Sequence, residues 1–185
     1  MRQYLILIFV VFFAVACKKY EDKSAEDLDL QNTYCNDPLA VNYNWGFPGS
    51  PDNSTCIYPR DLFEGTYILE DSVYYKDFTL EKVVTRMMQV DAVALNKLNV
   101  TLDSLCPNEK KTMLPVTADR FFKASIDSAR AYDSTLFPGY PICGTDTING
   151  FMRKGNVGDN HIRIQFTVYS DTGKISYHIG TAIKQ

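Results

Sequence analysis

The chain has 185 residues, which is enough for one domain with a small appendage. Hydrophobic residues make up 45% of it and charged residues 22%, proportions that are typical of a globular protein. The net charge of −3 gives no basic excess, so no nucleic-acid partner is expected. Two histidines in the whole chain also leave little of the residue type that most often serves in catalysis and metal binding.

The N-terminus has the pattern of an export signal. Arg2 precedes an uncharged run over residues 4–16, which is shorter than the roughly 20 residues of a transmembrane helix and fits a secretory signal peptide. The run ends in Ala-Val-Ala-Cys, which resembles the lipobox of bacterial lipoproteins. The resemblance implies that a signal peptide of residues 1–16 is removed and that Cys17 is diacylated. The alternative is an ordinary signal peptide followed by an incidental cysteine.

Residues 17–34 are expected to form a flexible tether, because charged residues crowd the segment and few side chains there could build a core. Lys18 stands where enterobacterial lipoproteins that stay in the inner membrane carry Asp. The resemblance therefore favours the outer membrane, on its periplasmic or its surface side. The sequence Lys-Lys-Tyr-Glu-Asp over residues 18–22 is also similar to the tethers of surface-exported lipoproteins of Bacteroidota.

Cysteine parity supports the lipid. The chain has five cysteines, and an odd number would leave one thiol unpaired. If Cys17 carries the lipid, four cysteines remain, and these allow three pairings. The most local pairing, Cys35 with Cys56 and Cys106 with Cys143, respects an apparent boundary near residue 60 and fits an oxidising periplasm. None has Cys-x-x-Cys spacing, which disfavours zinc and thioredoxin chemistry.

Residues 35–59 are expected to form a small cysteine-bounded module. The segment is rich in Asn, Asp, Pro and Gly, the residues of turns. It resembles a short repeat of secreted Bacteroidota proteins, of the form C-x-D-P-x-A-x-N-Y-N followed by D-x-x-S/T-C-x-Y. The matching residues are Cys35, Asp37, Pro38, Ala40, Asn42, Tyr43, Asn44, Asp52, Thr55, Cys56 and Tyr58. The resemblance implies an extracellular spacer or adhesion-type module.

The same module offers oxygen ligands for calcium. Asp37, Asn42, Asn44, Asp52 and Asn53 could supply them. They lack the spacing of a calcium-binding loop, however, and Asn and Asp more often make side-chain turns. These residues therefore predict turns and no metal ligands.

Residues 60–185 are expected to form a mainly β domain, a small antiparallel barrel or sandwich. Runs over residues 65–75 and 98–102 carry the β-branched, aromatic and alternating apolar residues of strands. The stretch Phe-Glu-Gly-Thr-Tyr over residues 63–67, followed by Asp-Ser-Val-Tyr over 71–74, looks like the lipocalin-like domains of bacterial lipoproteins. Tyr67 occupies the position of the lipocalin Trp. Residues 117–132 fit either a helix or a strand, and these alternatives stay open.

The clearest strands lie at the C-terminus. Ile162, Ile164, Phe166 and Val168 share one face, and Arg163, Gln165, Thr167 and Tyr169 share the other. A partner strand places Ile175, Tyr177 and Ile179 in the core. A four-residue loop, 171–174, then predicts that Val168 faces Tyr177 and that Phe166 faces Ile179.

We find no motif for catalysis, a cofactor or a metal. Residues 150–155 carry two glycines but lack the Lys of a phosphate-binding loop, so they are expected to be an ordinary loop. In the register above, His161 and His178 point away from the core and are expected to be solvated. Asp followed by Ser or Thr and a small or apolar residue resembles the O-glycosylation acceptor of Bacteroidota. This tripeptide occurs five times, with its hydroxyl at Ser72, Ser104, Ser128, Ser134 and Thr147.

The expected function is that of a lipid-anchored outer-membrane lipoprotein with a non-enzymatic binding or surface-scaffold role. Its partner would be a small apolar or glycan ligand held in a barrel. The alternative is a structural component that contacts an envelope protein and holds no small ligand. A carboxylate-based hydrolase of the glycoside hydrolase kind is third, because no pair among the acidic residues stands out.

Overall fold

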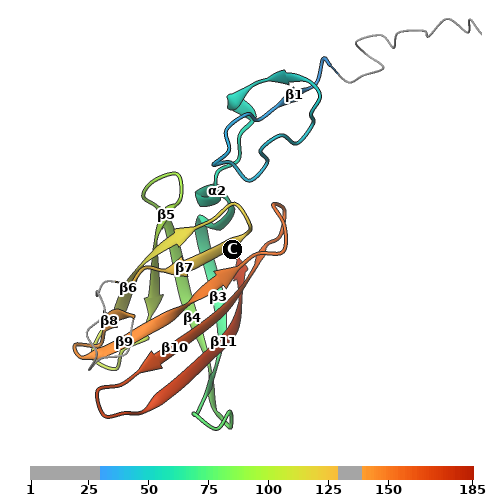
Figure 1. Cartoon of the computed structure of the whole chain (residues 1–185). Helices are drawn as coiled ribbons and strands as arrows, with labels where there is room; N and C mark the ends of the chain where they lie inside the picture. Colours follow the sequence, from blue (N-terminus) through green and yellow to red (C-terminus); the bar gives the residue numbers. More distant parts are fainter. Residues whose placement is uncertain (1–29, 129–138) are drawn as a thin grey trace, which may run out of the picture.

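The computed structural model describes residues 30–128 and 139–185 of the chain. Eight antiparallel strands close into a barrel, with a small disulfide-bonded module beyond one end (Figure 1). The barrel strands are β3 (Gly65–Tyr74), β4 (Leu80–Ala92), β5 (Lys97–Asp103), β6 (Lys111–Ala118), β7 (Lys123–Ile126), β9 (Asp146–Arg153), β10 (His161–Tyr169) and β11 (Ile175–Lys184). The expected mainly β class is confirmed, and the barrel is the correct one of the two alternatives.

Neighbouring strands of the ring follow the chain order with one exception. The strand β8 (Tyr140–Ile142) pairs only with the start of β9, so β7 pairs directly with β9. The ring closes because β10 pairs with β9 and with β11, and β11 pairs with β3. A closed ring leaves no strand edge of the barrel open for pairing with another chain.

The barrel interior is filled by side chains from the inward face of every strand. Alternation along β5 shows the pattern, since Leu98, Val100 and Leu102 are all buried. The interior side chains include Tyr67, Leu69, Met88, Val90, Leu98, Val100, Leu102, Leu114, Val116, Ala118, Ala124, Ile148, Met152, Ile162, Ile164, Phe166 and Ala182. An eight-stranded barrel is just wide enough for its own side chains to fill it.

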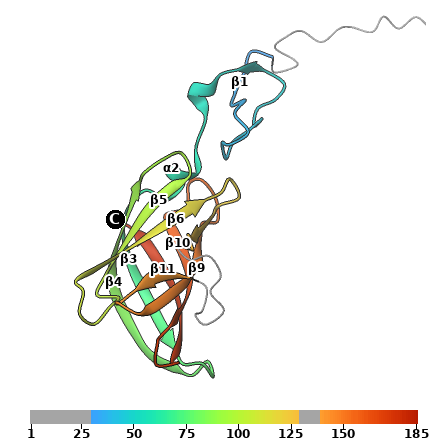
Figure 2. The same cartoon turned by 60° about the vertical axis from the view of Figure 1, so that its left-hand side comes forward.

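A short helix, α2 (Pro59–Phe63), lies at the end of the barrel next to the module (Figure 2). The Asp61 carboxylate accepts a hydrogen bond from the Tyr58 amide at 2.8 Å, which caps the first turn. Leu62 and Phe63 are buried against the barrel core. The Tyr67 hydroxyl donates to the Phe63 carbonyl at 2.8 Å, and burial raises the pKa of Tyr67 to about 12. The helix thus joins the barrel core at this end.

The module contains two short parallel strands, β1 (Thr33–Tyr34) and β2 (Ser50–Pro51), and a turn of 3-10 helix, η1 (Asn53–Thr55). Its contacts with the barrel include two between distant parts of the chain. Val41 packs against the barrel core, and the Arg120 guanidinium donates to the Pro38 carbonyl at 3.0 Å.

The C-terminal hairpin forms where the alternation predicts it, but its loop is shorter than expected. The Ser170 amide donates to the Lys174 carbonyl at 2.8 Å, so only residues 171–173 lie in the loop. Gly173 takes a φ of +81°, the left-handed conformation that this kind of three-residue loop requires. One residue fewer in the loop shifts the register by one.

The register shift reverses the two faces of β11. Phe166 faces His178 instead of Ile179, so the predicted pairing of Phe166 with Ile179 and of Val168 with Tyr177 is wrong. Ile179 is 41% exposed, whereas His178 is buried. The predicted core face of β10 is correct, because the register error does not affect which residues of that strand alternate inward.

Two further expectations are settled by the strand pairings. Within residues 117–128 the strand alternative is correct, since Lys123–Ile126 pairs with both β6 and β9, while residues 129–138 lie outside the described part of the chain. The loop expected over 150–155 is wrong for residues 150–153, because β9 continues to Arg153. A Cβ at Gly150 would lie 2.2 Å from the Gln165 carbonyl oxygen, so this glycine permits a close approach of β9 to β10.

Candidate functional site

Both predicted disulfides are present. Cys35–Cys56 closes the module, with a Cα–Cα distance of 4.9 Å, and Cys106–Cys143 ties the loop between β5 and β6 to the loop between β8 and β9, with a Cα–Cα distance of 5.2 Å. Cys17 lies outside the described residues, so its lipidation stays a prediction. In the described part of the chain no helix has the length and apolarity that crossing a membrane requires.

The oxygen-rich residues of the module hold its turns. The Asp37 carboxylate accepts from the Leu39 amide at 2.9 Å. The Asn42 side chain donates to the Thr55 carbonyl and accepts from the Ile57 amide, both at 2.8 Å. Within the described residues, no group of three or more His, Cys, Asp or Glu side chains is arranged to hold a metal ion. The module is therefore organised by side-chain turns.

The predicted glycosylation acceptors differ in exposure. Ser104 and Ser128 are exposed, and Ser72 lies half-buried on the outward face of β3. Thr147 is buried at 4% exposure, which leaves no room for a glycan on its hydroxyl. Ser134 lies outside the described residues. O-glycosylation stays a prediction, and Ser104 and Ser128 are its most accessible positions.

A polar cluster lies buried inside the barrel. Asp71 of β3, Arg86 of β4 and His178 of β11 have side chains that are 2%, 6% and 8% exposed. The prediction that His178 is a solvated surface residue is therefore wrong, and the one-residue register shift is the reason. His161 is exposed, as expected, and pairs with Asp159.

The three side chains meet at one carboxylate oxygen. Asp71 Oδ2 accepts from Arg86 Nε at 3.1 Å and from His178 Nδ1 at 2.9 Å. The Arg86 guanidinium also donates to the main-chain carbonyls of residues 103 and 104. His178 Nε2 lies 3.3 Å from the Ser176 hydroxyl. The cluster thus links β3, β4 and β11 with the end of β5.

Opposing effects set the pKa of Asp71. Burial alone would raise it, but the hydrogen bonds and charges of His178 and Arg86 outweigh burial and hold the pKa below its ordinary value. The carboxylate is therefore ionised and charge-paired. Its second oxygen, Oδ1, is buried without a hydrogen-bond partner among the described residues. Enclosed by the barrel wall, the cluster can order the strands around it.

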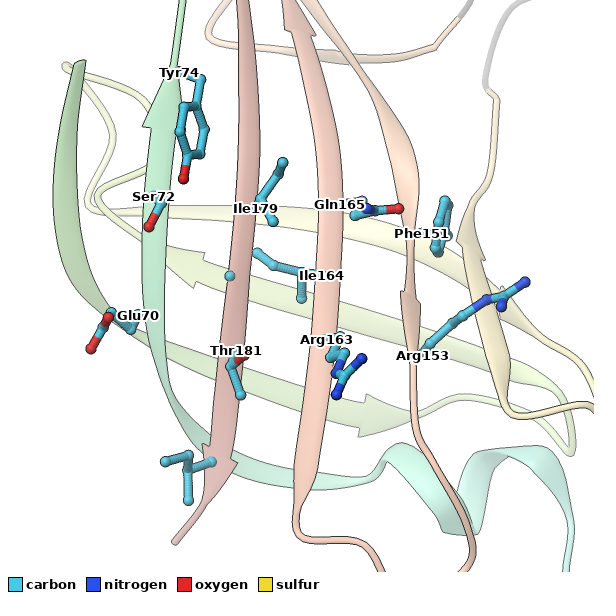
Figure 3. Close-up of a pocket in the computed structure, with 12 residues that line it drawn as sticks. Glu70, Ser72, Tyr74, Phe151, Arg153, Arg163, Ile164, Gln165, Ile179 and Thr181 are labelled. Atoms are coloured by element: carbon cyan, nitrogen blue, oxygen red, sulfur yellow. The ribbon is translucent and has the colours of Figure 1, made fainter. Parts of the chain in front are cut away.

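An open groove lies on the outside of the barrel wall, with a volume of about 630 Å³ (Figure 3). It crosses β9, β10, β11 and β3, and two rows of outward side chains line it. The first row, in strand order, is Arg153, Arg163, Thr181 and Glu70, and the second is Phe151, Gln165, Ile179 and Ser72. The groove combines guanidinium, amide, hydroxyl and apolar groups on one accessible surface.

Three cations stand side by side at one end of the groove. Lys123 of β7 is paired with Arg153 of β9, and Arg153 is paired with Arg163 of β10. We call these three residues the basic row. Directly opposed side chains on neighbouring strands have Cβ atoms about 4.5–5.5 Å apart, and like charges at that distance are destabilising. Among the described residues, no carboxylate lies within ion-pair distance of the basic row.

Phe151 holds two members of the basic row in place. Lys123 Nζ lies 4.8 Å from the centre of its ring, and the Arg153 guanidinium carbon lies 5.5 Å from it. Both distances fall within the range of cation–π attraction. The two long side chains are thereby restrained beside the groove, which reduces the entropy they would lose on binding a ligand.

A second hollow, of about 510 Å³, continues from the groove. Arg153, Arg163 and Thr181 line both, and Lys154 and His161 belong to the second. Burial, followed by the charge of nearby Lys184, lowers the pKa of Lys154, whose ammonium donates to a main-chain carbonyl of α2 at 2.7 Å. The second hollow thus adds the Lys154 cation beside the basic row, and it also contains the carboxylate of Asp159, which pairs with His161.

Sequence reasoning found only part of this surface. Alternation along β10 places Arg163 and Gln165 outward, and the structure agrees. Arg153 and Phe151 were missed, because residues 150–155 were assigned to a loop. The inward positions Ile148 and Met152, four residues apart, would have indicated that the strand continues across Gly150.

Neither a protein-family model nor a curated protein matches the chain. Among solved structures, a redesigned β-barrel is similar, with 15% sequence identity and a TM-score of 0.44 over 69% of this chain and 96% of that one. A structural-genomics protein of unknown function from Bacteroides ovatus has 11% identity and a TM-score of 0.41, over 66% of this chain and 42% of that one.

Proposed function

We propose that the protein is a lipid-anchored lipoprotein of the bacterial cell envelope with a non-enzymatic binding role, and that the outer groove of the barrel is its binding surface. The N-terminal lipid would hold the molecule at the outer membrane. The tether and the module would then carry the barrel away from the lipid.

The packing of the barrel supports an outer surface as the place of binding. Large side chains, among them Tyr67, Met88, Met152 and Phe166, occupy the interior. Strands β3, β4 and β11 are further joined there by the ion pairs of Asp71. A ligand in the interior would have to displace these groups, whereas the groove is already open.

The observation that carries the proposal is the basic row. Three cations in register, without a carboxylate partner in the described structure, would be disfavoured on a surface with no ligand to offset their repulsion. The two disulfides support the compartment, because such bonds persist in oxidising environments.

Photo-crosslinking in intact cells tests this proposal. A photoreactive residue at Gln165, in the middle of the groove, is expected to form an adduct with a component of the cell envelope. The matched control is the same residue at Met113, an exposed outward position on β6. Identical adducts at both positions, or none at Gln165, would contradict the assignment of the groove as the binding surface.

A structural role is the second candidate, and one observation favours it. Ile183, Ile68 and Met87 are paired across β11, β3 and β4, and they are 48%, 36% and 49% exposed. A row of exposed apolar side chains is typical of a surface that contacts another protein. In this case Ile68 and Met87, which lie outside the groove, would be the positions that crosslink, and Gln165 would not.

A further inference from the structure

We infer that the groove binds an anionic glycan, with the carboxylates of its acidic sugars on the basic row. This inference deepens the proposed function and rests on it. It assigns the charge of the ligand, the chemistry of the rest of the ligand and its extended shape, each from a different feature of the groove.

The basic row assigns the charge. Arg153 and Arg163 are opposed on neighbouring strands and lack a carboxylate partner in the described structure. The planar guanidinium group binds carboxylates through two parallel hydrogen bonds. An anion between the two side chains would replace their mutual repulsion by two attractive contacts.

The remaining lining residues favour a sugar as the uncharged part of the ligand. Gln165, Thr181 and Ser72 present amide and hydroxyl groups that can both donate and accept hydrogen bonds, as sugar hydroxyls require. Ile179 lies among them and offers an apolar surface for the carbon–hydrogen face of a ring. Glu70 stands two strands from Arg163, roughly 10 Å away by the strand spacing, where it can accept from hydroxyls without opposing the anion.

The continuity of the two hollows assigns the extended shape. The groove and the second hollow share Arg153, Arg163 and Thr181, so a single chain can occupy both. Asp159 also lines the second hollow and keeps its negative charge, while its carboxylate accepts from the amides of Gly155 and His161 and lies 3.1 Å from the His161 ring nitrogen Nδ1. A polymer therefore fits this surface better than one small anion.

Titration calorimetry of the purified full chain in detergent tests the inference, with polygalacturonate as the probe and neutral dextran as its uncharged counterpart. Polygalacturonate is expected to bind and dextran is not. The double substitution Arg153→Gln and Arg163→Gln should weaken binding by about tenfold or more, as expected for the loss of two charge-assisted contacts. Raising the salt concentration should weaken binding of the unsubstituted chain, since exposed charges are screened.

The matched control is the double substitution Lys110→Gln and Lys111→Gln, which removes two exposed charges outside the groove. It should leave the affinity within about twofold. Equal losses in both double variants would overturn the inference, because binding would then reflect net charge. Equal binding of polyglutamate and polygalacturonate would also overturn it, because it would identify an acidic polypeptide as the ligand class.

The outcomes of the two experiments are separable. An adduct at Gln165 in cells, without polygalacturonate binding, would overturn the anionic glycan and leave the groove as the binding surface. Absence of that adduct would contradict the proposed function itself. Thermal unfolding of the double arginine variant should occur at the same temperature as that of the unsubstituted chain or at a slightly higher one, because both side chains project outward from the barrel and their mutual repulsion is removed.

Discussion

Asp71 carries a negative charge inside the barrel, where an unpaired charge would be costly. Its side chain is nearly inaccessible to water, and contacts with Arg86 and His178 stabilise the ionised form of the carboxylate. A buried ion pair contributes little net stability by itself, but removing one partner leaves an uncompensated charge. The cluster should therefore be sensitive to substitution.

The substitution Arg86→Gln is expected to lower the free energy of unfolding by about 3–5 kcal/mol, because Asp71 loses its charged partner in a buried place. Denaturant unfolding measures this. The control is Arg163→Gln on the outer wall, which should change stability by no more than about 0.5 kcal/mol. Similar effects of the two substitutions would show that Arg86 does not hold a buried charge.

The same residue predicts a dependence on pH. The pKa of Asp71 is lower in the folded protein than its ordinary value of 3.8, so the ionised form stabilises the folded state. This stabilisation is complete above the pKa that Asp71 has in the unfolded chain. It is lost as the pH falls through the lower pKa that Asp71 has in the folded protein.

Unfolding free energies should therefore fall more steeply with acid in the unsubstituted chain than in Asp71→Asn, between about pH 5 and pH 2. The comparison with Asp71→Asn separates this residue from the other acids of the chain. Parallel curves would show that Asp71 has the same pKa in the folded and the unfolded chain.

At the scale of elements, the hairpin of β10 and β11 contributes to both the barrel interior and the proposed groove. Its inward face supplies Phe166 and His178, and its outward face supplies Arg163, Gln165 and Ile179. Rigid strands hold such outward side chains more precisely than a loop would. The stability of the hairpin is thus linked to the geometry of the groove.

Phe166→Ala is expected to destabilise the barrel by about 3–5 kcal/mol, because it opens a cavity at a side chain that is 3% exposed. Thr167→Ala, on the outward face, should have an effect of no more than about 0.5 kcal/mol. The denaturation midpoints of the two variants provide the measurement. A larger effect at Thr167 would reverse the face assignment of β10.

At the scale of the whole molecule, the structure describes a module and a barrel, and the proposed lipid anchor would precede both. Among the described residues no helix is long and apolar enough to cross a membrane. The proposed attachment is the lipid on Cys17. A single acyl chain binds a membrane only weakly, whereas two acyl chains on one cysteine give stable attachment. The arrangement would leave the outer wall of the barrel accessible.

Cys17→Ser should move the protein from the membrane fraction to the soluble fraction, because the substituted residue cannot carry the diacyl group. Fractionation of cells followed by immunoblotting measures this. The control is the double substitution Cys35→Ser and Cys56→Ser, which removes a disulfide and should leave the protein on the membrane. Unchanged partitioning of Cys17→Ser would contradict lipidation.

The sequence alone determined the features that depend on local pattern. Alternation gave the strands and faces of β5 and β10, and parity together with locality gave the two disulfides. The β class followed from the same patterns. These features were predictable because the pleat of a strand fixes its two faces within a few residues, whatever the strand pairs with.

Only the tertiary structure decided which side chains meet. His178 turned inward because the loop before it is one residue shorter than expected, and it then met Asp71, 107 positions away in the chain. Lys123 and Arg153 are neighbours because β7 pairs directly with β9, although β8 lies between these two strands in the chain. No local pattern contains such pairings. They follow from closing eight strands into one ring, where each strand's neighbours are set by the packing of the whole interior.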